Sequence, residues 1–357
     1  MRRALALARR GLGTTSPNPV VGAVLVRKGR VVGEGWHKKA GGPHAEVVAL
    51  RGVNARGTTL YVTLEPCSTW GRTPPCTDAI VAASVKRVVV AARDPNPKHD
   101  GRGLQMLRRA GICVEAGLLA AEAGGMNEGF NKWITTGMPL VIAKAAMSLD
   151  GKIATHTGDA KWITSVAARR EAHRWRARVD AIVVGANTVI RDDPELTVRH
   201  GVHGQQPWRV VVDARGRVSR MARILRDAQR RRTLVLTTSL SPATWRQYLS
   251  RTGVEVIVVP HKSGRADLRA ALKALGKRDI TSVLVEGGGE LLGSLFDARL
   301  VDRVALFYAP IVIGGRGAVA VVAGKGASRV GKAMRLRDCR WRRVGRDEML
   351  LEASVAR

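Results

Sequence analysis

One histidine, two cysteines and one glutamate stand at spacings that suit a catalytic metal site. His44 and Glu46 are separated by one residue, and Cys67 and Cys76 follow further along the chain. Three ligands of the His/Cys/Cys type leave the fourth tetrahedral position of a zinc ion open for water, as a catalytic site requires. The ion lowers the pKa of that water, so that hydroxide is available near neutral pH. The sequence therefore predicts Zn²⁺ bound by His44, Cys67 and Cys76.

Glu46 is poorly placed to bind the same ion, because it follows the histidine ligand by only two positions. It is instead suited to carry a proton between the water and a leaving amine. The pattern His-x-Glu followed by Pro-Cys is typical of zinc deaminases that act on nucleobases. A lone His-x-Glu is mostly accidental, but Pro66 and a second cysteine after eight residues are hard to obtain by chance. These residues predict a deaminase with Glu46 as its catalytic residue.

Positive charge dominates the composition, with 60 Lys and Arg against 29 Asp and Glu and a formal net charge of +31. Such charge favours anionic partners and promotes nonspecific binding to nucleic acid. Only 4% of residues are aromatic, however, so a base-stacking surface is poorly supplied. We expect most arginines to be solvated and a few to bind a phosphorylated small molecule.

The sequence indicates neither a membrane span nor a disulfide framework. No run approaches the roughly 18 apolar residues that a span requires, and two of the four cysteines belong to the predicted metal site. Cys113 is expected to be a buried small residue, and Cys339 has no evident partner. The N-terminus favours an amphipathic helix ending at Gly11 over an organellar transit peptide. We expect a cytoplasmic protein.

Two α/β domains are expected to position these residues. In the first half, strands are predicted over 20–26, 31–37, 59–64 and 87–91, and helices begin near His44 and at Cys76. The pattern loosens over 124–139, so we place a boundary there and predict domains 1–138 and 139–357. The second half is predicted to hold a largely parallel sheet, with strands over 140–146, 181–185, 209–213, 233–237, 254–259 and 282–286 and helices over 165–178, 241–251 and 266–275.

A glycine turn over 286–290 follows the last of these strands and precedes a helical pattern. Unpaired amides at a helix N-terminus bind phosphate well. A tight structural turn explains three consecutive glycines about as often as a ligand does, and the dinucleotide fingerprint Gly-x-Gly-x-x-Gly is missing.

Motifs spread over residues 17–315 resemble those of the bifunctional deaminase–reductase family of bacterial riboflavin biosynthesis. The resemblance rests on runs 17–22, 42–46, 63–67, 71–76, 148–152, 161–165, 192–194 and 285–288. It implies a cytidine-deaminase-like α/β/α domain followed by a dihydrofolate-reductase-like α/β domain. The first would hydrolyse the 2-amino group from a diaminopyrimidinone ribosylamine 5′-phosphate, and the second would use NADPH to reduce the ribosyl group to ribityl.

The resemblance also implies roles for particular residues. In the first domain it implies substrate contacts for Asn18, His37 and Arg72. In the second domain it implies substrate contacts for Ala160, Arg176, Leu196, Arg199 and Glu286, with the arginines suited to the 5′-phosphate. Positions implied for NADPH are Ala146, Trp162, Thr188, Asp192, Gly288, Gly289, Glu290, Leu291, Leu292, Gly293 and Ser294.

Several of these residues have a purely structural alternative. Trp162 could belong to the core, Asp192 could form the turn before Pro194, and His37 could be a structural histidine at a strand end. Arg176 and Arg199 could be solvated like most other arginines. Three further histidines are expected to be surface residues, namely His173, His200 and His203.

The chain departs from the family pattern at three places. Thr69 replaces a histidine that faces the substrate, and Ala160 stands where a serine is common. The chain also begins directly at Met1-Arg2-Arg3 without the usual acidic-aromatic leader, which predicts a clipped first helix or a misplaced start. Thr69 keeps open a second hypothesis, a reductase whose deaminase domain is impaired. A nucleic-acid-acting deaminase is the third, although such proteins usually space their cysteines as Pro-Cys-x-x-Cys. By resemblance alone, we expect a homo-oligomer.

Overall fold

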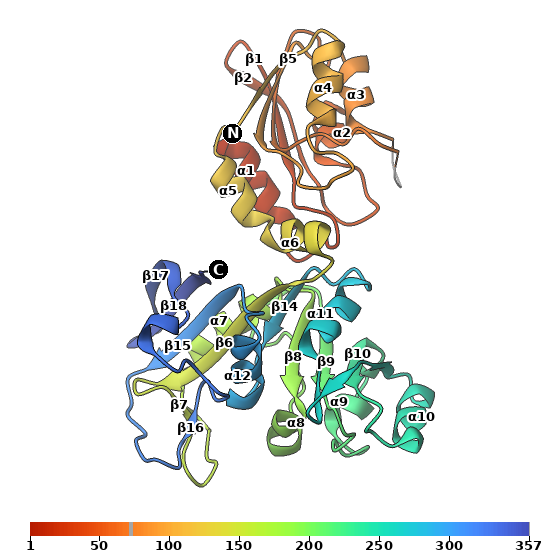
Figure 1. Ribbon diagram of the computed structural model, residues 1–357. Helices are drawn as coiled ribbons and strands as arrows, with labels where there is room; N and C mark the ends of the chain where they lie inside the picture. Colours follow the sequence, from red (N-terminus) through yellow and green to blue (C-terminus); the bar gives the residue numbers. More distant parts are fainter. Residues whose placement is uncertain (71–73, 357) are drawn as a thin grey trace. The chain divides into compact units, whose positions relative to one another are not determined.

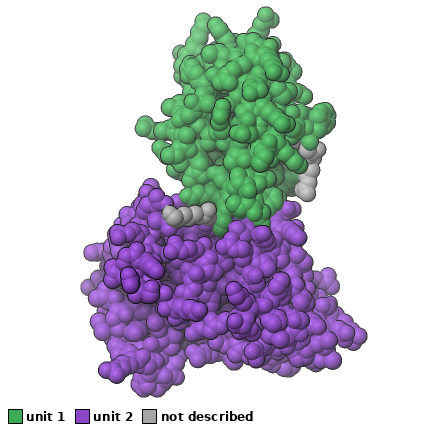
Figure 2. All heavy atoms as spheres, in the orientation of Figure 1, with its two compact units in different colours: residues 1–137 green, residues 138–357 purple. Residues whose placement is uncertain are grey.

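The computed structural model describes residues 1–70 and 74–356. The chain forms two compact units, Met1–Gly137 and Met138–Arg357 (Figures 1 and 2). Each unit has its own sheet and its own hydrophobic core. Within the described residues, no helix is long and apolar enough to cross a membrane.

A five-stranded sheet in the order β2-β1-β3-β4-β5 forms the centre of the first unit. β1 pairs with β2 and β3 in antiparallel fashion, whereas β3, β4 and β5 run parallel. The strands are β1 (Gly22–Arg27), β2 (Arg30–Trp36), β3 (Thr59–Leu64), β4 (Arg87–Ala92) and β5 (Cys113–Ala116).

Helices cover both faces of this sheet and give the predicted α/β/α layers (Figure 1). α1 and α5 pack on one face, and α2, α3 and α4 contribute apolar side chains to the core on the other. α2 approaches β2 so closely that a Cβ on Gly35 would lie 2.6 Å from the carbonyl oxygen of Ala45. The helices are α1 (Arg2–Ala8), α2 (Ala45–Leu50), α3 (Cys76–Ala82), α4 (Arg102–Arg109), α5 (Ala120–Met126) and α6 (Glu128–Thr136), with a 3₁₀ turn η1 (Arg9–Gly11).

The second unit is built on a nine-stranded sheet in the order β11-β10-β9-β8-β14-β6-β15-β18-β17. Neighbours from β11 to β15 are parallel, and the last three strands are antiparallel. The strands are β6 (Leu140–Ser148), β8 (Ala181–Gly185), β9 (Trp208–Val212), β10 (Thr233–Thr237), β11 (Glu255–Val258), β14 (Ser282–Val285), β15 (Arg303–Ala309), β17 (Leu336–Val344) and β18 (Glu348–Val355).

Helices on the two faces bury the apolar rows of this sheet. α11 and α12 pack on the face that carries Val183 and Val285, whereas α7 packs against Ile142 and Leu284 on the other. The helices are α7 (Val166–Arg176), α8 (Ala186–Asp192), α9 (Arg223–Arg226), α10 (Ala243–Arg251), α11 (Leu268–Gly276) and α12 (Gly289–Asp297). Short elements complete the unit, namely β7 (Lys152–Ala154), β12 (His261–Lys262), β13 (Arg265–Ala266), β16 (Val319–Ala320), η2 (Arg230–Arg232) and η3 (Val330–Lys332).

Three expectations are corrected. The segment expected to loosen before the boundary is helical, because α5 and α6 occupy most of it. Cys113 is exposed rather than buried, since β5 is an edge strand. His173 is 5% exposed and therefore not a surface residue, because its imidazole packs against the backbone of Arg199 and the ring of His200. The N-terminal helix is confirmed, with Leu5 and Leu7 buried.

Candidate active sites

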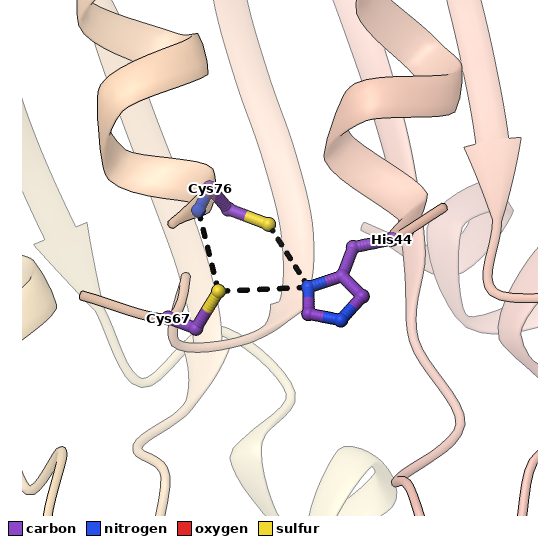
Figure 3. A group of neighbouring side chains, drawn as sticks. All are labelled: His44, Cys67 and Cys76. Atoms are coloured by element: carbon purple, nitrogen blue, oxygen red, sulfur yellow. Dashed lines mark hydrogen bonds between the residues drawn. The ribbon is translucent and has the colours of Figure 1, made fainter. Parts of the chain in front are cut away.

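Three elements bring the predicted metal ligands together in the first unit. His44 is the residue before α2, Cys67 follows the end of β3, and Cys76 opens α3. Their ligand atoms all lie within 4.8 Å of one another. His44 Nδ1 is 3.2 Å from Cys76 Sγ and 3.5 Å from Cys67 Sγ (Figure 3).

These separations fit one tetrahedral zinc ion. Zn–S and Zn–N bonds of about 2.3 and 2.0–2.1 Å place a sulfur and a nitrogen about 3.6 Å apart at the tetrahedral angle. The backbone N–H of Cys76 donates to Cys67 Sγ at 3.2 Å, which favours a thiolate. Hydrogen bonding from the Cys76 thiol, followed by that from His44, lowers the pKa of Cys67 to about 4. Two cysteine sulfurs and one imidazole form a donor set that suits zinc.

Glu46 lies beside this cluster in a buried position. Its side chain is on the first turn of α2 and the residue is 3% exposed. Burial, and then the negative charge of Cys67, raise the pKa of Glu46 to about 7. A carboxyl group with a pKa near the working pH can both accept and return a proton.

Asn18 and His37 meet next to the metal ligands. Asn18 Nδ2 is 3.1 Å from His37 Nε2, and His37 Nδ1 is 3.0 Å from the carbonyl oxygen of Pro43. A carbonyl only accepts, so Nδ1 carries the proton and Nε2 accepts from Asn18. The imidazole packs edge-on against that of His44, with 5.4 Å between ring centroids. Arg72 lies outside the described residues, and Thr69 is exposed.

Glu65 is a residue of this site that sequence reasoning left without a role. The carboxylate is 3% exposed and accepts the backbone N–H groups of Asp94, Gly101 and Gly103 at 3.3, 3.1 and 3.0 Å. It thereby fixes the end of β3, from which Cys67 follows, to the turn after β4. The sequence did contain a signal for this role, namely a charged residue directly before Pro-Cys at the end of a buried strand. A buried charge needs hydrogen-bond partners.

In the second unit, Arg176 and Glu286 form a buried ion pair. Arg176 Nε and Nη2 donate to the two carboxylate oxygens of Glu286 at 2.7 and 2.9 Å, and Nη1 donates to the carbonyl of Thr197 at 2.9 Å. The side chains are 12% and 9% exposed. Burial alone would raise the pKa of Glu286, but the charges of Arg176 and Lys144 outweigh it and hold that pKa well below its usual range. Arg176 is therefore not a solvated arginine.

Lys144 is a second residue that sequence reasoning missed. It projects from β6, and its Nζ lies 3.6 Å from Glu286 Oε2 and 5.7 Å from the ring centroid of Phe307. Its side chain is 14% exposed. The signal was a single lysine inside an otherwise apolar strand, since a cation in a strand covered on both faces needs a partner.

The loop after α8 carries two predicted substrate residues. Leu196 is 3% exposed and has a φ of +50°, whereas Arg199 is exposed and pairs with Glu195. Glu195 also pairs with Arg223. The guanidinium of Arg199 is thus accessible, and the carboxylate that it pairs with is shared with Arg223.

The glycine turn after β14 leaves open space at one position. Gly288 precedes α12 with a φ of −67°, and its N–H donates to Thr188 Oγ1 at 3.3 Å. A Cβ on Gly288 would meet only that Oγ1, at 3.8 Å, whereas a Cβ on Gly289 or Gly293 would lie 2.4 or 2.1 Å from a backbone oxygen of the 320–323 segment. Gly289 and Gly293 therefore serve packing, but Gly288 leaves a cradle that a ligand backbone or phosphate can approach.

The other residues predicted to contact NADPH or substrate lie on different elements of the second unit. Ala146 is half-buried on β6, Asp192 is exposed at the end of α8, and Ala160 is exposed. Trp162 is 74% exposed, which rules out the core alternative, and the guanidinium of Arg169 lies 4.3 Å from its ring centroid. Along α12, Glu290 pairs with Arg265, Leu291 and Ser294 are half-buried, and Leu292 is buried.

Comparison with known proteins matches both units. Residues 1–92 match the cytidine and deoxycytidylate deaminase zinc-binding region, and residues 139–350 match the RibD C-terminal domain. The riboflavin biosynthesis protein RibD of Aquifex aeolicus is 45% identical over 88% of this chain and 87% of its own. That of Escherichia coli is also 45% identical, over 88% of each chain. A solved structure of Acinetobacter baumannii RibD has a TM-score of 0.90 at 40% identity and covers 100% of this chain and 98% of that chain.

Fold and site together define a two-domain enzyme that joins a zinc-dependent deaminase to a reductase. The predicted α/β classes of both halves are confirmed. The chain belongs to the RibD family of riboflavin biosynthesis proteins. A Thermotoga maritima structure with a TM-score of 0.86 and 37% identity is described as a diaminohydroxyphosphoribosylaminopyrimidine deaminase/5-amino-6-(5-phosphoribosylamino)uracil reductase.

Proposed function

We propose that this chain deaminates the diaminopyrimidinone ribosylamine 5′-phosphate of riboflavin biosynthesis and then reduces its ribosyl group with NADPH. We assign the deaminase to residues 1–138 and the reductase to residues 139–357. The observation that carries the proposal is the His44, Cys67 and Cys76 cluster with buried Glu46 beside it. Family membership supplies the substrate and the second reaction.

In the deaminase, each residue of the chain has a separate task. Zinc, when bound by His44, Cys67 and Cys76, supplies a water of lowered pKa. Glu46 would take a proton from this water and deliver it to the leaving amine, a task for which a pKa of about 7 is suited. The Asn18 and His37 pair presents fixed polar groups to the pyrimidine. Arg72 is assigned to substrate binding by resemblance only.

In the reductase, NADPH, when bound, would supply a hydride to the ribosyl carbon C1′. The bond between this carbon and the ring oxygen breaks as the ring opens, and the ring oxygen must then accept a proton. Lys144 is a partly buried amine held by Glu286 at 3.6 Å, and we assign it to donate that proton. Arg199 is assigned to the 5′-phosphate, since its guanidinium is accessible. Arg176 binds Glu286 and the carbonyl of Thr197, so we assign it to hold these two groups of the substrate site in position.

The cofactor is assigned to the cradle at Gly288 with Thr188 beside it. We also assign the exposed ring of Trp162, against which the guanidinium of Arg169 packs, to contact the cofactor. Ala146, Asp192 and the rest of the turn from Gly288 to Ser294 are assigned to NADPH by their match to the family pattern.

Two further assignments concern the setting of the enzyme. All four cysteines are free, and two of them are exposed, which supports a reducing compartment such as the cytoplasm. A homo-oligomer is proposed on family resemblance alone. The substrate is a small phosphorylated molecule, and the large positive charge suits its capture.

The test is ammonia release from the diaminopyrimidinone substrate, with zinc supplied and NADPH omitted. Glu46→Gln should abolish release, because the amide cannot carry the proton. The matched control Glu122→Gln changes an exposed glutamate on α5 and should retain full release. Both variants should still oxidise NADPH on the deaminated intermediate. Wild-type protein that oxidises NADPH without releasing ammonia would instead establish a reductase with an inactive first unit.

A further inference from the structure

His173 is a buried histidine in the last turn of α7 that the proposed reaction does not use. Its Nδ1 accepts the backbone N–H of Arg199 at 2.8 Å. One helical turn later, Arg176 donates to the carbonyl of Thr197 at 2.9 Å. Two side chains on one face of α7 therefore hold two backbone groups of the loop that presents Arg199.

The backbone of this loop is tied down at every residue from 197 to 199. Gln206 contacts both backbone groups of Val198, its Oε1 accepting at 2.8 Å and its Nε2 donating at 3.1 Å. Leu196 and His200 have φ values of +50° and +59°, in a region that side-chain-bearing residues rarely adopt. Such a conformation persists only when surrounding contacts hold it. For the N–H of Arg199, that contact is the imidazole of His173.

The hydrogen bond requires His173 to be neutral, with its proton on Nε2. Burial, followed by the nearby positive charge of Arg176, lowers the pKa of His173 to about 3. His200 packs edge-on at 4.7 Å between ring centroids, and the charges of Arg199 and Glu286 also act on the ring. Nδ1 is therefore an acceptor throughout the physiological range of pH.

We propose that His173 is a positioning residue for substrate recognition in the reductase, acting through the backbone of Arg199 so that the guanidinium meets the substrate 5′-phosphate. This inference rests on the proposed role of Arg199. The exposed guanidinium of Arg199 can exchange its carboxylate partner, which also pairs with Arg223, for a phosphate. In this role His173 acts only through the backbone N–H of Arg199, so its removal should loosen Arg199 without removing a reacting group.

The test compares His173→Leu with His173→Asn in the full-length zinc-loaded enzyme. Asparagine places an amide oxygen close to the position of Nδ1 and preserves the acceptor, whereas leucine keeps the bulk and removes it. Each variant is assayed for kcat and KM with the deaminated intermediate, with its dephosphorylated form, and with NADPH.

Leucine is expected to raise KM for the phosphorylated substrate about tenfold, as the loss of one well-placed hydrogen bond implies. The KM for NADPH and the kcat/KM for the dephosphorylated form should stay within about twofold, and asparagine should restore most of the loss. Loss of selectivity for the phosphorylated form is the readout that packing alone would not change. Should the leucine variant not accumulate, His173→Ser, which is polar but too short to reach the amide, replaces it.

Equal losses on both forms of the substrate, or equal behaviour of leucine and asparagine, would show that His173 only packs α7 and would overturn the inference. A wild-type enzyme that reduces both forms equally well would instead refute the role of Arg199 in phosphate binding. These two failures are distinct, because the second is seen before any variant is made.

Discussion

Neutralising Glu286 is expected to destabilise the second unit severely. Its carboxylate compensates two cations, Arg176 through two hydrogen bonds and Lys144 at 3.6 Å, in a setting where the three side chains are 9%, 12% and 14% exposed. Removing one partner of a buried pair costs about 3–5 kcal/mol, because the other charge is left without compensation. Glu286→Gln leaves two such charges, so we expect a loss of free energy of unfolding in that range.

Removing one cation should cost far less. Lys144→Met keeps most of the aliphatic stem and leaves the Arg176–Glu286 pair intact, so we expect a loss of about 1 kcal/mol. Glu286→Gln leaves both cations without a compensating charge. The double variant should therefore lose less free energy of unfolding than the sum of the two single losses, by about 1–2 kcal/mol. This non-additivity is a direct measure of the charge coupling.

The measurement must separate the two units, since unfolding of a two-domain chain is not one two-state transition. Hydrogen exchange read by mass spectrometry in rising urea gives the stability of peptides from β6, β8 and β14. Peptides from β1 and β3 provide the control in the same sample and should not change. A loss below about 1 kcal/mol for Glu286→Gln, or strictly additive variants, would show that these charges are hydrated and would refute the reasoning.

Three more outcomes are expected. Cys76→Ser should lower bound zinc from about one ion per chain to below about 0.1 by elemental analysis and stop ammonia release, while NADPH oxidation on the deaminated intermediate continues. Gly288→Ala should raise KM for NADPH about tenfold. The thermal midpoint should change little, because the added Cβ meets no atom beyond its chain neighbours closer than 3.8 Å. An unchanged KM would remove Gly288 from the proposed cofactor site. Between its folded pKa of about 3 and an unfolded value of about 6.5, His173 takes up a proton only on unfolding, so stability falls as pH drops through this window, by about 2 kcal/mol at pH 5. Hydrogen exchange in rising urea, read on peptides of the second unit, should lack that part of the acid sensitivity in His173→Asn.

The metal cluster could be predicted from sequence because its chemistry is carried by residue types. Few arrangements of His44, Cys67 and Cys76 are compatible with the flanking strands and helices. Their spacing was therefore sufficient to predict that the three ligands meet. The burial of Glu46 depends on how closely α2 packs on β2 at Gly35, and a sequence pattern does not show this packing. The role of Glu65 was hidden for a similar reason, since its partners are backbone groups of a turn 29–38 residues away.

Among the strands that were missed, β17 lacks a periodic signal. β17 carries four arginines and is exposed along most of its length, because it is the edge of the sheet, so its apolar and polar residues do not alternate. The parallel strands from β11 to β6 are continuous apolar runs and were predictable. Lys144 looked like an interruption of such a run, although it is the cation that completes the Glu286 network.

The position of β14 has a consequence for the order of folding. β6, β8, β9, β10 and β11 precede β14 in the sequence, yet β14 lies between β6 and β8 in the sheet and pairs Leu284 with Ile142 across 142 positions of sequence. Until β14 is in place, β6 and β8 lack the neighbour that lies between them in the folded sheet. Pairing between strands so distant in sequence is slow, and the unpaired apolar strands are prone to aggregation in the meantime. Glu286 and Gly288 directly follow this strand, so we expect the Glu286 charge network and the proposed cofactor cradle to form only once β14 has paired with β6 and β8.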